Sequence, residues 1–172
     1  MNFVKIIALS FTFISSFNII KSFGVKKKKE VLELISYSKL LEDLYLEVNI
    51  FSTPIIKSLK KSMRSNKMYN KIFEEFEIKW QESDVSVESC FNQILIKNIK
   101  KLHFSKNNEF LFLELYKVFT FLDRKNLENH ITYLQNLVNK EIKFLEKNAR
   151  EDELLFKKLS LLGALATVVV LI

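Results

Sequence analysis

The chain has 172 residues but only two glycines and one proline, where average usage would give roughly 12 and 9. So few turn-forming residues exclude β-sandwiches and β-barrels, and the lack of closely spaced glycines excludes Walker and GxGxxG phosphate loops. Lysine plus arginine exceeds aspartate plus glutamate by 27 to 20, a balance typical of nucleic-acid binding, of contact with an anionic membrane, or of the cytoplasmic flanks of membrane helices.

The first apolar stretch lies at the N-terminus and contains Lys5 and Lys21 near its two ends. Over residues 3–23, with both lysines directed toward the headgroups, it would form a helix of roughly 31 Å, enough to cross a bilayer. A cleaved signal peptide is the competing interpretation, but no small-x-small cleavage site follows. Four consecutive lysines come next: Lys26, Lys27, Lys28 and Lys29. Because such a block of charge resists translocation, we favour an uncleaved transmembrane helix.

From residue 25 to residue 153 the apolar side chains recur at steps of three and four, which predicts a helical-bundle domain. Its first helix is predicted from Val31, with a buried face of Leu34, Tyr37, Leu41, Leu44, Val48 and Phe51. A short helix follows, for which Thr53 is the predicted N-cap and Pro54 fits the first turn.

Further helices are predicted over 69–80, 87–102 and 110–122, separated by short polar segments. The third is the most apolar, and its predicted buried face is Phe110, Leu113, Tyr116, Val118, Phe119 and Leu122. Asp123 is predicted to cap a final helix, with apolar positions from Leu127 to Leu145. The short connections favour antiparallel neighbours in a bundle.

The second apolar stretch ends the chain, with no charge from Leu159 to Ile172. Counted over 154–172 it gives a second predicted transmembrane helix of roughly 28 Å, with Lys157 and Lys158 at the headgroups. Three small residues occupy neighbouring helical positions, where they either favour packing against another membrane helix or are merely tolerated: Ser160, Gly163 and Ala164.

The lysine clusters lie at the inner ends of the two apolar stretches. By the positive-inside rule, this places the domain over 25–153 in the cytoplasm and both termini on the outer side. The membrane also accounts for the lysine-rich flanks, and the remaining basic residues are interleaved with acidic ones. We therefore expect no nucleic-acid binding.

Residues suited to catalysis or metal binding are few. His103 and His130 are far apart, and neither has a neighbour at ligand spacing, so we expect no metal, no cofactor and no catalytic site. Cys90 lies among apolar positions and is expected to be a small buried residue. Glu47 approaches an otherwise apolar helix face, which makes it the most unusual of the acidic residues.

The segment from Leu44 to Ile55 resembles the sequence Leu-x-x-Glu-Ile-x-Tyr-x-x-Thr-Pro-Leu of the stage III sporulation protein AB family of endospore-forming bacteria. The resemblance extends over the whole chain: Val87–Phe91 is similar to the family's Glu-Ala-Trp region, with Phe91 in place of tryptophan. Asp123, with Thr120 in place of glycine, follows the family's Leu-Gly-x-x-Asp pattern.

The resemblance implies an all-α protein with a cytoplasmic helical bundle between an N-terminal and a C-terminal transmembrane helix. The family is similar to the inner-membrane platform domain of type II secretion. It acts on the mother-cell side, in the outer forespore membrane, as a non-enzymatic part of a channel assembly. Its implied partners are the membrane and other channel-assembly proteins, including a cytoplasmic ATPase, and a homo-oligomer is a further expectation. The residues carried over as structural or partner-contact candidates are Glu47, Thr53, Pro54, Asp123 and Arg124.

Two alternatives remain open at this point. The chain could be a platform component of a pilus or type II-like secretion system outside sporulation. It could also be an exported helical protein, anchored at its C-terminus, whose signal peptide is removed.

Overall fold

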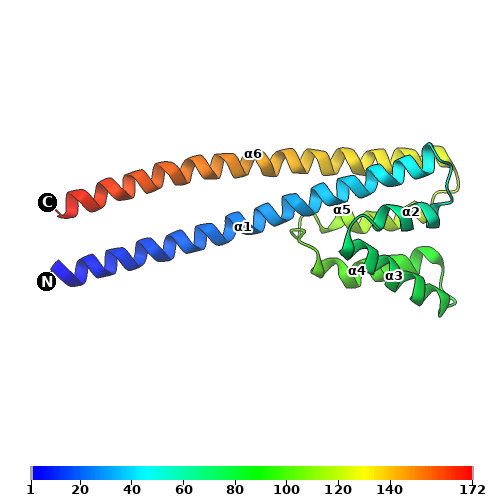
Figure 1. Cartoon of the computed structure of the whole chain (residues 1–172), viewed down its shortest axis with the longest axis horizontal. Coiled ribbons are helices and arrows are strands. Elements are labelled where there is room, and N and C mark those ends of the chain that lie inside the picture. Colours follow the sequence, from blue (N-terminus) through cyan, green and yellow to red (C-terminus); the bar gives the residue numbers. More distant parts are fainter. Residues whose placement is uncertain (1, 172) are drawn as a thin grey trace. The chain divides into compact units, whose positions relative to one another are not determined.

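The structure is a computed structural model that describes the backbone of residues 2–171 and the side chains of residues 25–156, 158, 159 and 162. Within this part of the chain every regular element is a helix, which confirms the all-α prediction (Figure 1). In chain order the elements are α1 (Asn2–Asn49), α2 (Ile55–Met63), α3 (Lys67–Gln81), α4 (Val87–Asn98), the 3₁₀-helix η1 (Ile99–Lys101), α5 (Glu109–Leu113), the 3₁₀-helix η2 (Glu114–Phe119) and α6 (Arg124–Leu171).

The chain forms two compact units. The helical domain is Glu30–Ile142, and the terminal unit combines the part of α1 up to Lys29 with the part of α6 from Lys143. In the terminal unit, Lys27 Nζ lies 2.5 Å from Asp152 Oδ2. The other flanking lysines whose side chains the structure describes are exposed: Lys26, Lys28, Lys29 and Lys158.

The two predicted membrane spans fall within α1 and α6, whose backbones are helical there. Among the residues that the structure describes, no helix has a stretch long and apolar enough to cross a bilayer. The side chains of residues 3–23 lie outside the described residues, and so do most of those in 154–172. The latter include Lys157, Ser160, Gly163 and Ala164.

Within the helical domain, α1 and α6 run antiparallel, as the short connections predict. Tyr45 Oη donates to Glu128 Oε1 at 3.0 Å, and Ser38 Oγ donates to Asn139 Oδ1 at 3.1 Å. In these two pairs the residue number on α6 rises as the residue number on α1 falls, as antiparallel helices require. Both helices bury apolar faces at steps of three and four, which confirms most of the predicted positions.

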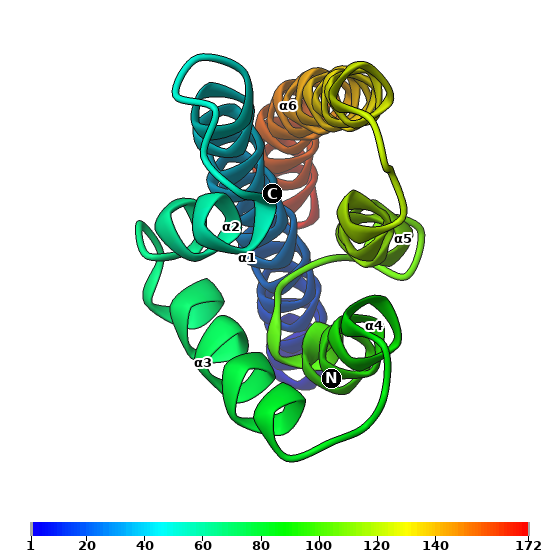
Figure 2. The same ribbon diagram turned by 90° about the vertical axis from the view of Figure 1, so that its right-hand side faces the viewer.

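Aromatic rings form much of the core of the helical domain. Tyr37 of α1 contacts Phe112 of α5 at a ring-centroid distance of 5.3 Å, and Phe112 stacks on Tyr69 of α3 at 5.5 Å. Phe76 of α3 meets Phe91 of α4 edge-on at 5.0 Å. These rings are fully buried, and each such pair contributes about 0.5–1.5 kcal/mol beyond its area burial. These contacts join α3, α4 and α5 to one another and to α1, and Figure 2 shows how these helices lie together.

The short helix α2 is held differently. Its buried face combines Leu59 and Met63 with two serines, Ser58 and Ser62. Ser62 Oγ donates to the carbonyl of Ser58 at 2.8 Å, and Ser58 Oγ donates to the carbonyl of Thr53 at 3.0 Å. Both hydroxyls therefore bond to α2 or to the turn before it, and not to the helices around them.

Two predicted helix boundaries are wrong. Phe51 is not part of the buried face of α1, because the helix ends at Asn49 and the chain turns through Ser52, whose φ is 51°. Thr53 is not the N-cap of α2. Pro54 takes that position, and the Thr53 hydroxyl donates to Glu47 Oε2 at 2.9 Å instead. The capping role of Asp123 is confirmed, since its Oδ1 accepts from the amide of Asn126 at 2.8 Å.

The predicted helix over 110–122 is also wrong as a single α-helix. The segment forms one short α-helix, α5, and then the 3₁₀-helix η2, which ends at Phe119. A 3₁₀-helix has three residues per turn, so the buried positions depart from the 3.6-residue period. The side chains that are buried here are Leu111, Phe112, Leu115 and Val118, whereas Phe110 and Leu122 are exposed.

Candidate functional site

The five residues carried over from the family pattern meet where α1 turns into α2 and where α6 begins. We call this region the corner and define it as residues 47–54 and 122–124. On its α1 side, Glu47 accepts from Thr53 Oγ1 and from Lys61 Nζ, both at 2.9 Å. The amide of Thr53 also donates to the carbonyl of Glu47 at 2.9 Å, so the side chain and the backbone of Glu47 both fix the turn.

Arg124 joins the start of α6 to the same turn. Its Nε donates to Asn49 Oδ1 at 3.3 Å, its Nη1 donates to Ser52 Oγ at 3.1 Å, and its Nη2 donates to the carbonyl of Asn49. The guanidinium thus accommodates the last carbonyl of α1, which no longer has a helical partner. A small cavity of about 200 Å³ lies beside it, between Val48, Thr53 and Leu127.

Both carboxylates of the corner are held in their charged form. The Lys61 ammonium bonded to Glu47 lowers the pKa of that carboxyl group, with a smaller effect in the same direction from the Thr53 hydroxyl. The amide of Asn126 lowers the pKa of Asp123. Neither group therefore carries a proton to donate near neutral pH, and the corner presents fixed charges.

Three large apolar side chains project from this charged frame. Ile50 and Phe51 are 63% and 65% exposed, and Leu122 is fully exposed. Ile50 and Phe51 lie in the turn that Arg124 fastens, and Leu122 lies two residues before Arg124 in the chain. Large apolar residues exposed together, with polar residues around them, are typical of a protein-contact surface.

The family pattern names five residues that lie at the corner, namely Glu47, Thr53, Pro54, Asp123 and Arg124. It does not name Asn49 and Ser52, which accept hydrogen bonds from Arg124. The positive φ of Ser52 is a backbone property, and serine carries little signal for it. The exposure of Phe51 follows from that turn, so it was missed for the same reason.

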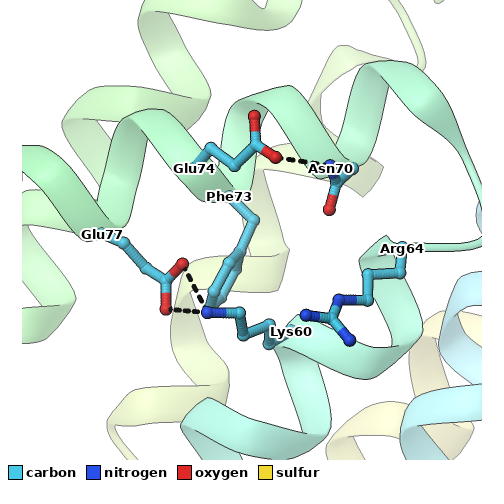
Figure 3. A pocket seen from close by; sticks show the side chains of 6 residues that line it. All are labelled: Lys60, Arg64, Asn70, Phe73, Glu74 and Glu77. Atoms are coloured by element: carbon cyan, nitrogen blue, oxygen red, sulfur yellow. Dashed lines mark hydrogen bonds and ion pairs between the residues drawn. The ribbon is translucent and has the colours of Figure 1, made fainter.

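A second pocket, of about 530 Å³, lies between α2 and α3 (Figure 3). Lys60 Nζ bonds both oxygens of Glu77, at 2.7 and 2.8 Å, and Asn70 Nδ2 donates to Glu74 at 2.7 Å. Figure 3 shows the guanidinium of Arg64 beside these pairs without a bond to them. Since the polar groups mostly satisfy one another, the pocket offers little that would hold a substrate.

The most buried carboxylate in the helical domain is Glu30, at 8% exposure. Its Oε1 accepts from the amide of Ser105 at 3.0 Å and from Asn108 Nδ2 at 2.8 Å. The same Asn108 nitrogen donates to Glu141 Oε1 at 3.1 Å. We call these four residues the buried cluster; they link α1, the segment before α5, and α6. No sequence pattern pointed to them.

The remaining titratable candidates are in separate places. His103 Nδ1 lies 3.4 Å from Glu33 Oε2, while His130 Nε2 lies 3.2 Å from the carbonyl of Glu114. Burial lowers the pKa of His130. Cys90 is buried, as predicted. Within the part of the chain that the structure describes, no three His, Cys, Asp or Glu residues are grouped so that they could hold a metal ion.

The helical domain, with its partly apolar corner held by Arg124, places the chain among all-α helical-bundle proteins. The chain belongs to the family described as Stage III sporulation protein AB, whose profile matches residues 5–172, and it is thus a stage III sporulation protein. This confirms the resemblance. It also favours sporulation over the pilus and secretion alternative.

The fold is also similar to a solved structure titled "Stage III sporulation protein AB (SpoIIIAB)". The TM-score is 0.60 at 15% sequence identity, and the match covers 71% of this chain and 97% of that one. At this identity the likeness supports the fold alone. No curated protein sequence matches this chain.

Proposed function

We propose that the chain is a non-enzymatic membrane platform of the mother cell–forespore channel assembly, and that the corner is the surface on which a cytoplasmic ATPase docks. In this proposal two membrane helices, over 3–23 and 154–172, hold the domain over 25–153 on the cytoplasmic side of the outer forespore membrane. The function is positional, because the domain keeps a partner at a fixed place beside the membrane.

The membrane part of the proposal rests on the sequence. Each apolar stretch has lysines at its inner end, and the described ones are exposed apart from Lys27, which is paired with Asp152. Positive charge at that place favours retention on the cytoplasmic side. The helical backbone is continuous through residues 3–23 and through 154–171, as two spanning helices require.

The observation that carries the docking surface is the exposure of Ile50 and Phe51 on a turn that polar contacts fasten, together with the exposure of Leu122 just before α6. A preorganised turn loses little conformational freedom when a partner covers it, so more of the apolar contact appears as affinity. The charges of Arg124 and Asp123 at the rim would orient the partner. We therefore expect the ATPase to present an apolar pocket with polar groups around it.

The test replaces the exposed apolar side chains and leaves intact the polar residues that hold the turn. In sporulating cells, the Phe51→Ala/Leu122→Ala double variant should no longer co-purify with the ATPase, and heat-resistant spores should fall by about tenfold or more, as expected when an interface loses two central contacts. The matched control is Ile96→Ala/Tyr133→Ala, which removes two comparably exposed side chains from α4 and α6. If the Phe51→Ala/Leu122→Ala variant co-purified with as much ATPase as the wild-type chain, the corner would be ruled out as the docking surface.

The topology has its own test. A probe cysteine at Ser65, an exposed position near Lys60, should react with a membrane-impermeant thiol reagent only after the cells are lysed. Cys90 is buried and gives little background labelling. Labelling in intact cells would contradict the cytoplasmic assignment and would revive the exported alternative.

A further inference from the structure

Charge is unevenly distributed along α2, α3 and the start of α4. From residue 48 to residue 73 there is no acidic residue but six basic ones: Lys57, Lys60, Lys61, Arg64, Lys67 and Lys71. From residue 80 to residue 96 there is no basic residue but three acidic ones: Glu82, Asp84 and Glu88. The net charge of the chain therefore conceals a local separation of opposite charges within one domain.

Part of the basic stretch is already neutralised inside the domain. Lys60 pairs with Glu77 and Lys61 pairs with Glu47. The other four have no side-chain ion pair or hydrogen bond within the described part of the chain, and all four are exposed: Lys57, Arg64, Lys67 and Lys71. We call these four the basic surface.

The acidic side chains are equally unpaired. Glu82 and Asp84 are exposed in the connection between α3 and α4, and Glu88 is half-buried in the first turn of α4. None of the three has a side-chain partner within the described residues. We call them the acidic surface. The helical domain thus carries one group of four unpaired cations and, elsewhere on it, one group of three unpaired anions.

The two surfaces are too far apart to neutralise each other within one chain. Figure 2 shows α2 beside the N-terminal end of α3, and the connection to α4 at the other end. Lys71 is the member of the basic surface nearest to Glu82 along α3, and the 11 positions between them correspond to about 16 Å along the helix axis. Surface charges at that distance are largely screened at physiological salt, where the Debye length is about 8 Å.

We propose that the helical domain binds a second copy of this chain, with the basic surface of one copy against the acidic surface of the other. A second copy satisfies both surfaces at once, whereas an anionic membrane or a nucleic acid would cover the basic surface and leave the acidic one unpaired. Ile78 on α3 and Val85 in the acidic connection are exposed, and they supply apolar contact between the charges. This contact is separate from the corner, so it goes beyond the docking of the ATPase.

The test is a charge exchange in the full-length chain, purified in detergent with two different tags. Lys67→Glu/Lys71→Glu reverses the basic surface, and Glu82→Lys/Asp84→Lys reverses the acidic one. For each variant alone, the amount of one tagged copy recovered with the other should fall about tenfold, because like charges then face each other and repel. A mixture of the two variants should recover it. Higher salt should weaken the wild-type association.

The matched control is Lys125→Glu/Lys140→Glu, which makes the same charge change at exposed α6 positions of the helical domain. It should associate like the wild-type chain, and circular dichroism should show equal helix content for all variants. Association that survives either single reversal, or that the mixture fails to restore, would overturn the proposal. Loss of association in the control would also overturn it.

A cross-link in native membranes gives an independent readout. Lys71→Cys in one tagged copy and Asp84→Cys in the other should form an intermolecular disulfide on mild oxidation. Two copies of Lys71→Cys should do so far less, since basic surfaces face each other only by chance. Corner variants should leave this cross-link unchanged, so failure of the ATPase contact and failure of self-association are distinguishable. Equal cross-linking of the two combinations would contradict the proposed pairing.

Discussion

The buried cluster around Glu30 and the corner around Arg124 both tie α1 to segments far along the chain, but only the first is shielded from water. They lie near the two ends of the domain's part of α1, about 27 Å apart at 1.5 Å per residue. In the buried cluster, two donors hold one carboxylate that has almost no access to solvent. At the corner, Arg124 makes its side-chain bonds to Asn49 and Ser52 in an exposed position, where water can replace them.

The difference teaches that similar hydrogen bonds have unequal consequences. Removing one of two donors from a buried carboxylate leaves its charge poorly compensated and without water to replace the lost bond, whereas removing an exposed donor mostly returns its acceptors to water. The buried cluster should therefore determine the stability of the domain. The corner should determine local geometry and leave its surface available to a partner.

The largest effect is expected when Asn108 is changed to alanine. This removes the nitrogen that donates to both Glu30 and Glu141, and it should cost about 2–4 kcal/mol of unfolding free energy. The measurement is denaturant unfolding of the full-length chain in detergent, followed by circular dichroism. The control is Asn107→Ala, next to it but exposed, which should change little. Equal losses in both variants would contradict the importance of burial.

A smaller effect is expected from Ser52→Val. The φ of 51° at this residue lies in the left-handed region, which a β-branched side chain tolerates poorly, so about 1–2 kcal/mol should be lost. Ser52→Gly adopts the same φ without a side-chain penalty and should stay within about 0.5 kcal/mol of the wild-type chain. Both variants lack the Ser52 hydroxyl. The difference between their denaturant midpoints therefore reports the strain at the turn alone.

Arg124→Ala should cost about 1 kcal/mol, since its bonds to Asn49 and Ser52 are exposed. Lys125→Ala, at the next and equally exposed position, is the matched control. The same unfolding measurement checks it. A loss as large as that of Asn108→Ala would show that the comparison between the two clusters is wrong.

The smallest effect concerns pH. Lys61 lowers the pKa of Glu47 in the folded chain, so this ion pair stabilises the fold above the ordinary carboxyl pKa of about 4.3 and loses that contribution as the pH falls through the lowered value. Wild-type and Glu47→Gln chains should therefore differ in denaturation midpoint at neutral pH and converge once the pH has fallen below that lowered pKa. The difference should shrink with added salt. A difference that persists at low pH would contradict the ion-pair explanation.

How much of the fold and of the corner can be predicted depends on how far apart in the sequence the interacting residues lie. The 3.6-residue period found the buried faces of α1, α3, α4 and α6, because each is set by the helix itself. It failed over 110–122, where the chain changes to a 3₁₀-helix and the period changes with it.

The buried cluster carried no signal because its members come from positions 30, 105, 108 and 141. Glu30 follows four lysines and reads as one more surface charge, and Asn108 reads as part of a polar break. Only the tertiary arrangement brings them together. At the corner, the family pattern identified Glu47 and Arg124, but the backbone carbonyl of Asn49 that Arg124 binds has no sequence signature.

The serine hydroxyls of α2 bear on how the domain opens. Because Ser58 and Ser62 bond to the helix's own backbone and turn, α2 is held to its neighbours chiefly by Leu59 and Met63, with the Lys60–Glu77 and Lys61–Glu47 ion pairs at its surface. The interlocked rings of α1, α3, α4 and α5 do not include it. Detaching this nine-residue helix as a local unit should therefore cost less free energy than unfolding the whole domain. Its lysines can then adjust to an approaching surface while the aromatic core stays packed.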